Sequence, residues 1–455
     1  MKLTAAPRSL LALVAVLTIV LVPALPGAPV DQPTASAPTA TTPAGAGATD
    51  ASTAAPPGPA LAQAQRAELV QELLTAWAAA ERTNDPAALA GLMDSAADPV
   101  FRSAEAARAA NLTGVPLREW DYQLVAEPAP VVPPALVQRL GAQEVWAPPV
   151  VLRYAVSGVD ALATSRTVGL VVARRGGQWR LVTDTALTDY GRRTWRGPWD
   201  FGPVVVRSSE QGVVFGHPGA EPELDAVAEA LRTAVPAVTD FWGTGWPRQA
   251  LVVLTSSRAE LVSLVGEDFA GAGVAAVTTA DAVDRAAGTA AGVRVVADAP
   301  AVRALTRPSL SVVLRHELTH VATRTITADQ APLWMLEGFA DYAGYRGSGT
   351  AIASGAPEVA QLVRTVGAPT ALPVDADFAP TGPTTRAALA YQLSWTFAEF
   401  LAQTKGEAAL IQAYRSVAGL AAPTPAQVDA ALSAVGAPTD VLVAQWGLWL
   451  AAQLG

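Results

Sequence analysis

The stretch that decides how this chain is interpreted is PSLSVVLRHELTH, residues 308–320. Its proline and first serine suit the start of a helix, and no helix-breaking residue follows them up to residue 320. His316 and His320 are four residues apart, so on a helix both imidazoles project from one face and can reach one metal ion. Glu317 lies beside them as a candidate general base. The stretch therefore has the H-E-x-x-H pattern of zinc hydrolases.

Histidine is scarce in this chain, which has three histidines in 455 residues. The alternative to a metal site is a pair of ordinary helix histidines, either packed in the core or exposed at the surface. Ordinary packing has no need for the only close histidine pair in a His-poor chain. The scarcity of histidine therefore favours the metal site.

A catalytic zinc ion bound by two histidines needs a third protein ligand and an open position. The chain has no cysteine, and no histidine follows His320, so the third ligand has to be a carboxylate. The next predicted helix, PLWMLEGFADY at 332–342, holds Glu337 in an apolar stretch, where an unpaired carboxylate is costly. Asp341, one turn later, can accept the free N–H of a ligand histidine and set its tautomer. The alternatives are a surface acid for Glu337 and a solvated charge for Asp341.

The spacing of these residues resembles that of the gluzincin metallopeptidases: H-E-x-x-H, a gap of 16 residues, then Glu337, with Asp341 four residues further on. The phrase WMLEGFADY, at 334–342, is similar to the version found in secreted bacterial peptidase-MA-type domains. The resemblance implies that Zn²⁺ is bound by both histidines and Glu337, with Asp341 behind a ligand histidine. It further implies that Glu317 is the catalytic base and that the substrate is a peptide or protein. The strong match covers residues 309–345.

Gluzincins stabilise the oxyanion of their reaction with a tyrosine or histidine from the helical part downstream, and no histidine remains for this role. The resemblance implies Tyr391 as the second catalytic residue, while an aromatic side chain in a helix core is the alternative. The substrate would lie along an edge strand beside the active-site helix, and residues 273–277 are the candidate. They lack the Gly-x-Met-Glu-Asn signature that holds the substrate amine in aminopeptidases, so endo- or exopeptidase action stays open. The third histidine, His217, is predicted in a turn.

Composition excludes several other classes of function. Hydrophobic residues make up 51% and charged residues 16% of the chain, enough apolar material for a real core. The net charge of -9 argues against nucleic-acid binding, which depends on cationic neutralisation of phosphates. The absence of cysteine excludes disulfide scaffolds and thiol nucleophiles.

The N-terminal residues have the pattern of an export signal. Two cations precede an apolar run from Leu10 to Val22, which predicts a signal peptide or membrane anchor over residues 1–25 and an extracytoplasmic protein, secreted or in the cell envelope. Whether this segment is cleaved stays open, and an anchor would be the only contact with a membrane. Residues 26–60 are mostly Pro, Ala, Thr, Ser and Gly, which predicts a disordered linker.

The rest of the chain predicts an α+β protein in two units. The pattern of residues 61–195 predicts helices followed by a curved antiparallel sheet, with one strand at 167–173. This order of elements weakly resembles the nuclear transport factor two-like fold. Residues 200–455 read as a small sheet followed by a mostly helical part, the order expected of a gluzincin. A helix over 224–242 contains Pro236, which predicts a kink or break.

The sequence thus predicts an exported zinc metallopeptidase with an accessory unit before it. One alternative is a non-catalytic envelope binding or assembly module that retains a gluzincin-like metal site, although such a site has no use for Glu317. Another places the function in the accessory unit, with the second unit serving it. The oligomeric state, the substrate and any regulation stay open.

Overall fold

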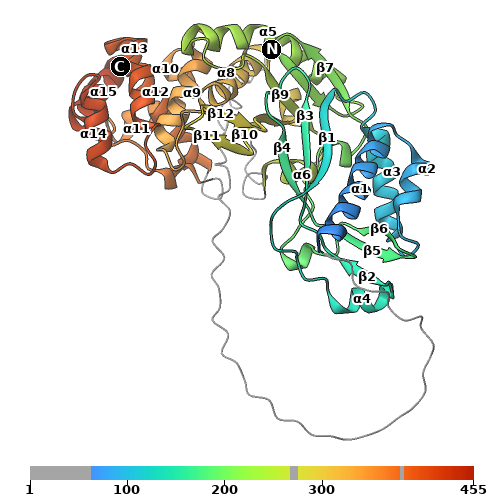
Figure 1. The fold of residues 1–455 in the computed structure, drawn as a ribbon. Helices are drawn as coiled ribbons and strands as arrows, with labels where there is room; N and C mark the ends of the chain where they lie inside the picture. The colour runs from blue at the N-terminus through green and yellow to red at the C-terminus, as the bar shows by residue number, and fades with distance from the viewer. Residues whose placement is uncertain (1–62, 267–274, 380–383, 455) are drawn as a thin grey trace, which may run out of the picture.

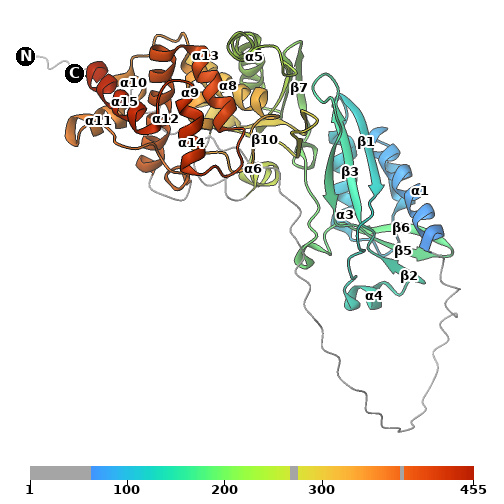
Figure 2. The same cartoon turned by 60° about the vertical axis from the view of Figure 1, so that its left-hand side comes forward.

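The structure, a computed structural model, describes residues 63–266, 275–379 and 384–454. Figure 1 shows three parts in chain order: an accessory part in blue to cyan, a central sheet in green to yellow, and helices in orange to red. Figure 2 shows the central sheet between the other two parts. The predicted export segment and linker, residues 1–60, lie outside the described residues.

The accessory part combines helices with two antiparallel three-stranded sheets. Its helices are α1 (Gln63–Arg82), α2 (Pro86–Leu92), α3 (Pro99–Asn111) and α4 (Pro134–Leu140). One sheet has the order β1 (Leu117–Leu124), β3 (Val150–Val156), β4 (Thr164–Val168), and the other β2 (Glu144–Trp146), β5 (Val171–Arg175), β6 (Gln178–Thr183). The carboxylates of Asp85 and Asp98 accept hydrogen bonds from the first backbone N–H groups of α2 and α3, which begins each helix at the proline that follows.

The single strand predicted over 167–173 is wrong, because the chain changes sheets within it. β4 ends at Val168 and β5 begins at Val171 in the other sheet. At Gly169 an added Cβ would lie 2.4 Å from the backbone oxygen of Arg192, so the chain turns where only glycine fits. Two short elements, α4 and β2, were not predicted.

A network of buried charges crosses the interior of the accessory part. The Arg108 guanidinium donates to Glu105 Oε1 at 2.7 Å, to Glu81 Oε1 at 3.2 Å and to Asp200 Oδ1 at 2.8 Å. The indole of Trp120 donates to Glu81 at 2.8 Å, and the side chains of both glutamates are fully buried. The Arg108 guanidinium therefore neutralises carboxylates from separate segments of the chain. It also links Asp200, which follows β6, to α3.

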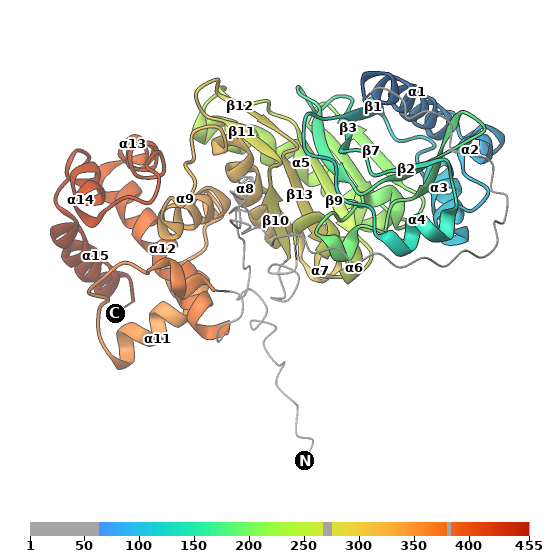
Figure 3. The same ribbon diagram turned by 60° about the horizontal axis from the view of Figure 1, so that its bottom comes forward.

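The central sheet has five strands in the order β10-β13-β9-β8-β7. They are β7 (Val205–Ser209), β8 (Gly212–Gly216), β9 (Ala250–Thr255), β10 (Ala276–Thr279) and β13 (Arg294–Asp298). The strands β8, β9 and β13 are parallel, while β7 and β10 run antiparallel at the two edges. Figure 3 shows β10 beside the long helix α8 (Arg307–Thr323). This places one edge of the sheet next to the H-E-x-x-H motif.

Both faces of this sheet are buried. Val214, Val252 and Leu254 belong to the core shared with the helices, whereas Val213 and Val253 belong to the core of the accessory part. Successive side chains of a strand point to opposite faces, so β8 and β9 supply both cores in alternation. A strand covered on both faces needs an unbroken apolar run, and ALVVL at 250–254 is such a run. The accessory part therefore covers one face of the central sheet at β8 and β9.

Two ion pairs, one buried and one partly buried, join the accessory part to this sheet. The Arg294 guanidinium on β13 donates to both carboxylate oxygens of Asp160, at 2.6 and 2.7 Å, with both side chains buried. Arg166 and Thr164 on β4 contact the carboxylate of Asp281, two residues beyond β10. These pairs hold the two strands nearest the H-E-x-x-H helix against the accessory part.

The long helix α5 (Glu221–Trp242) is continuous, so the chain does not break at Pro236, where a kink or break was predicted. Proline removes one backbone hydrogen bond, to the carbonyl of Arg232, and both residues are exposed to solvent there. On the opposite side Leu231, Ala234 and Val238 are buried in the core. Packing of this face keeps the helix in one piece.

The remaining elements are mostly helical. Together with the sheets described above, they confirm the predicted α+β class. After α6 (Arg258–Val265), the hairpin β11 (Ala282–Asp284) and β12 (Thr289–Ala291), and α7 (Ala299–Ala304), the chain forms α8 and α9 (Leu333–Tyr345). It ends in α10 (Ile352–Gly355), α11 (Pro357–Thr365), α12 (Thr384–Lys405), α13 (Glu407–Val417), α14 (Pro425–Ser433) and α15 (Thr439–Leu454), with short 3-10 turns η1 (Thr188–Tyr190), η2 (Pro198–Asp200) and η3 (Asp375–Phe378). Among the described residues, no helix combines the length and apolar character that crossing a bilayer requires.

Glycines let α9 approach its neighbours closely. At Gly338 an added Cβ would lie 2.4 Å from the backbone oxygen of Ser394 on α12, and at Gly344 it would lie 2.9 Å from that of Val312 on α8. The helix that carries Glu337 is thus held between α8 and α12 at short range. A side chain at either position would push Glu337 away from the histidines.

Gly338→Ala is expected to lower the free energy of unfolding by about 1–3 kcal/mol, because the new methyl group meets backbone that cannot move aside. Urea unfolding measures this. The control is Gly91→Ala in α2, where nothing lies within 4 Å of the added Cβ and alanine should stabilise the helix by about 0.5–1 kcal/mol. Equal stability of Gly338→Ala and the parent chain would contradict the close crossing.

Candidate metal centre

The histidine pair lies on α8, as its spacing predicts. The Thr306 hydroxyl accepts a hydrogen bond from the Ser309 backbone N–H and caps the helix, which then runs unbroken to Thr323. His316 and His320 follow each other by one turn, and both side chains are buried. Their Nε2 atoms are 3.0 Å apart. The two ring nitrogens therefore face one point.

Packing of α9 against α8 brings Glu337 to the same point. Glu337 Oε2 lies 3.3 Å from Nε2 of His316 and 3.6 Å from Nε2 of His320, and the Glu337 side chain is fully buried. Ligand atoms around a tetrahedral zinc ion, at bond lengths of about 2.0–2.1 Å, are separated by about 3.3 Å. The three donor atoms have this spacing. The structure thus brings together all three predicted metal ligands.

The buried carboxylate of Glu337 needs a cation at this point. Both of its oxygens have no hydrogen-bond partner among the described residues. A buried carboxylate left without a partner is strongly unfavourable. Two imidazole nitrogens and one carboxylate are also a donor set that suits Zn²⁺. The residues present therefore fit a zinc ion.

Asp341 supports the first histidine from behind. Its Oδ1 lies 2.7 Å from Nδ1 of His316, so the carboxylate accepts the Nδ1–H and leaves Nε2 directed at Glu337. Burial lowers the pKa of His316, but the Asp341 and Glu337 carboxylates outweigh burial and raise it to about 10. The surroundings of this ring therefore favour positive charge at the point where the three donors meet.

Glu317 lies next to this triad, and Thr278 fixes one of its oxygens. The Thr278 hydroxyl, on β10, donates to Glu317 Oε2 at 2.5 Å, while Oε1 has no hydrogen-bond partner among the described residues. Burial raises the pKa of Glu317, whereas His316, His320 and the Thr278 hydroxyl lower it. Sequence reasoning did not find Thr278, and its position one residue beyond the candidate edge strand was the only available signal.

Asp341→Asn is expected to weaken zinc affinity about 10–100-fold, because the neutral amide no longer supports the basicity of His316 and can present the wrong group to Nδ1. Competition with a chromogenic zinc chelator measures the affinity. The control is Asp329→Asn, whose side chain is 62% exposed. Unchanged zinc affinity in Asp341→Asn would show that the carboxylate does not act on the metal through His316.

Tyr391, the predicted oxyanion donor, is buried on α12, where its ring packs edge-on against Phe378 at 5.1 Å between centroids. Its catalytic role stays a prediction. The hydroxyl of Tyr342, on α9, donates to Glu407 at 2.7 Å, and that of Tyr414 lies 2.8 Å from the Thr327 hydroxyl.

The candidate substrate strand overlaps an edge strand. Among the described residues β10 pairs with β13 alone, so its other edge is a place where an extended peptide could add. Residues 273 and 274 of the predicted stretch lie outside the described residues. His217, at the end of β8, is engaged elsewhere: its Nε2 lies 2.8 Å from Glu260 Oε1, and its Nδ1 lies 3.0 Å from the Pro203 carbonyl oxygen.

Comparison with known proteins adds a distant likeness among solved structures. No family model matches the chain, and no curated protein matches it. Among solved structures, a variant of a two-domain M1 zinc metallopeptidase bound to L-arginine is similar over 62% of this chain, with 17% identity and a TM-score of 0.32. The match spans 58% of the length of that protein. A likeness at this level does not carry a function from that protein to this chain.

Proposed function

We propose that this protein is an exported zinc-dependent metallopeptidase of the gluzincin type. The observation that carries the proposal is the convergence of His316, His320 and Glu337 beside Glu317, whose Oε1 has no hydrogen-bond partner within the described part of the chain. Histidines and a carboxylate that leave one position open are typical of catalytic zinc, whereas structural zinc sites are closed by four protein ligands. The residues thus support a catalytic site.

His316, His320 and Glu337 would hold the zinc ion. The chemistry that zinc supplies when bound is Lewis-acid polarisation of a peptide carbonyl and acidification of water. Asp341 keeps His316 in the tautomer that presents Nε2, since it accepts the proton on Nδ1. The protein part of the site is therefore organised before any substrate arrives.

Glu317 is the proposed general base and acid. Thr278 holds Oε2, so Oε1 is the atom left to accept a proton from the attacking water and later to return it to the leaving amine. Because Thr278 belongs to β10, the strand along which the substrate would lie also positions the base. Tyr391 is proposed to donate a hydrogen bond to the oxyanion.

The metal site also bears on the alternative of a non-catalytic module. A module that used zinc only for stability would gain nothing from a buried glutamate beside the ligands, and burying such a group costs free energy. The presence of Glu317 therefore favours catalysis. Export, by a cleaved signal peptide or an anchor over residues 1–25, remains part of the proposal on the sequence pattern alone.

Zinc removal tests the proposal. The full chain is expected to bind one zinc ion and to cleave members of a peptide library. Chelation should abolish cleavage, and added zinc should restore it. Elemental analysis and mass spectrometry of the products measure the two properties. Absence of bound metal, or cleavage that persists in the fully metal-free protein, would overturn the proposal.

A further inference from the structure

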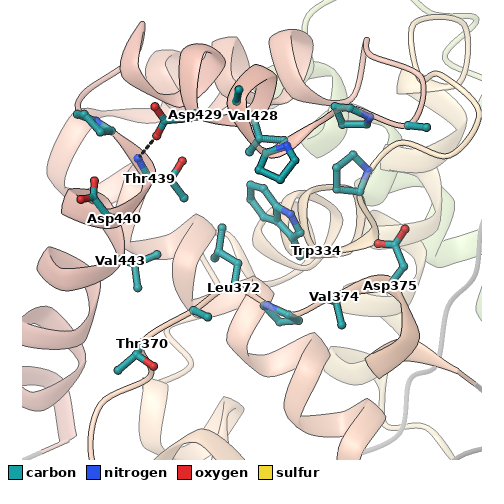
Figure 4. A pocket seen from close by; sticks show the side chains of 18 of the residues that line it. Trp334, Thr370, Leu372, Val374, Asp375, Val428, Asp429, Thr439, Asp440 and Val443 are labelled. Atoms are coloured by element: carbon teal, nitrogen blue, oxygen red, sulfur yellow. Dashed lines mark hydrogen bonds between the residues drawn. The ribbon is translucent and has the colours of Figure 1, made fainter.

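The helical part contains a large pocket whose lining does not include the three predicted zinc ligands. It has a volume of about 1310 Å³, and α9, α14, α15 and the segment 370–375 contribute to its lining. Figure 4 shows Trp334 and Leu372 in its middle, Asp375 on one side, and Asp429 and Asp440 on the other. Pockets for small molecules usually measure about 300–1,000 Å³. This one is large enough for several residues of a polypeptide.

The floor of the pocket is apolar and preformed. Trp334, Leu372, Val428 and Val443 line it, together with several prolines. Val374, at the edge, is 60% exposed, so apolar surface is available to a partner. Prolines have a fixed φ and no backbone N–H, and a wall built with them loses little conformational freedom when a ligand binds.

The charged residues that line the pocket are all acidic. They are Asp375, Asp429 and Asp440, and the described lining contains no lysine, arginine or histidine. Each of these carboxylates accepts one backbone N–H through Oδ1, from Leu333, Thr439 and Val441 respectively. The carboxylates are therefore held in place at the two sides of an apolar floor, and their field favours a cation.

We propose that this pocket binds an extended polypeptide segment whose apolar residues are flanked by arginine or lysine side chains. The apolar residues would cover Trp334 and Leu372, and the basic side chains would reach the carboxylates on either side. Two other occupants fit the charges less well. Residues 26–60 of this chain contain Asp31 and Asp50 and no basic residue, and a second copy would bring a further net charge of -9.

The pocket and the zinc site share helix α9. Trp334 and Glu337 are three residues apart, about 4.5 Å along the helix axis. If the protein is a peptidase, a polypeptide bound in this pocket is a substrate held at a distance from the bond that is cleaved. This catalytic role rests on the proposed function, but the identity of the ligand does not.

The test is binding of a fluorescent peptide, with leucine and proline between two arginines, to the full-length Glu317→Gln protein without metal. Asp375→Asn/Asp429→Asn/Asp440→Asn keeps an oxygen to accept each backbone hydrogen bond and removes three charges. Ala426→Trp fills the pocket from an exposed lining position, and Ala408→Trp, exposed on α13 outside the pocket, is its control. Fluorescence anisotropy measures the affinity.

We expect about tenfold weaker binding in the triple variant and in Ala426→Trp, with no change in Ala408→Trp. A peptide with glutamates in place of the arginines should not bind. The proposal is overturned by absence of saturable binding, by equal binding to Ala426→Trp, or by self-association of the parent chain that Ala426→Trp abolishes. Binding without cleavage of any substrate by the zinc-loaded wild type would overturn the proposed function and leave the ligand assignment standing.

Discussion

Glu317→Gln is expected to lower kcat/KM for peptide cleavage about 10²–10⁴-fold while zinc stays bound. Glutamine has nearly the shape of glutamate and can still accept the Thr278 hydrogen bond, but it cannot take up a proton at the position of Oε1. The three metal ligands are untouched, so the metal content should equal that of the wild type. This result would separate proton transfer from metal binding.

The measurement pairs zinc analysis with steady-state cleavage of one peptide from the library. Glu210→Gln, in an exposed turn between β7 and β8, is the matched control and should keep full activity. An equally active Glu317→Gln protein with zinc bound would rule out Glu317 as the base. Loss of zinc in this variant would instead assign Glu317 to the metal site itself.

Arg108→Met is expected to lower the free energy of unfolding by about 3–5 kcal/mol. Methionine fills a similar volume but leaves the carboxylates of Glu81 and Glu105 buried without their cation, and Asp200 loses a hydrogen-bond partner. The same loss should weaken the packing of the accessory part against the central sheet. Urea unfolding of the full chain at pH 7 measures the effect.

The cost of Arg108→Met should shrink as the pH falls from 7 to 5. Burial raises the pKa values of Glu81 and Glu105 above 4.5, and the Arg108 charge lowers them. In Arg108→Met that charge is missing and both pKa values rise further. The folded variant then takes up protons that its unfolded chain does not, so the variant gains stability relative to the parent chain as the pH falls. Arg118→Met, at an exposed position of β1, is the control. A pH-independent loss would contradict this account.

Much of the metal centre could be predicted from the sequence because its geometry is local. His316 and His320 share a face of α8 through helical spacing alone, and the scarcity of histidine and absence of cysteine left a carboxylate as the third ligand. Glu337 was the candidate because it lies in an apolar stretch. The close approach of α9 to α8 and α12, at Gly344 and Gly338, could not be read from the spacing.

The sequence did not predict that Thr278 holds Glu317. Thr278 meets the glutamate because β10 lies at the sheet edge beside α8, and a shift of one residue in its register would turn the hydroxyl to the other face. Strand pattern predicts that an edge exists and says little about register. The predicted role of Tyr391 also depends on how helices far apart in the chain pack together, which strand and helix patterns do not give.

By itself the sequence determined the α+β class, the helix that carries the histidine pair and the type of the third ligand, since these follow from local spacing and composition. Only the tertiary structure decided that Glu337 meets the histidines, that Thr278 holds Glu317, that α5 stays whole at Pro236, and that the accessory part covers one face of the central sheet. The physical reason is that each of these depends on burial and close packing between distant segments. Their energies outweigh local preferences such as the helix-breaking tendency of proline.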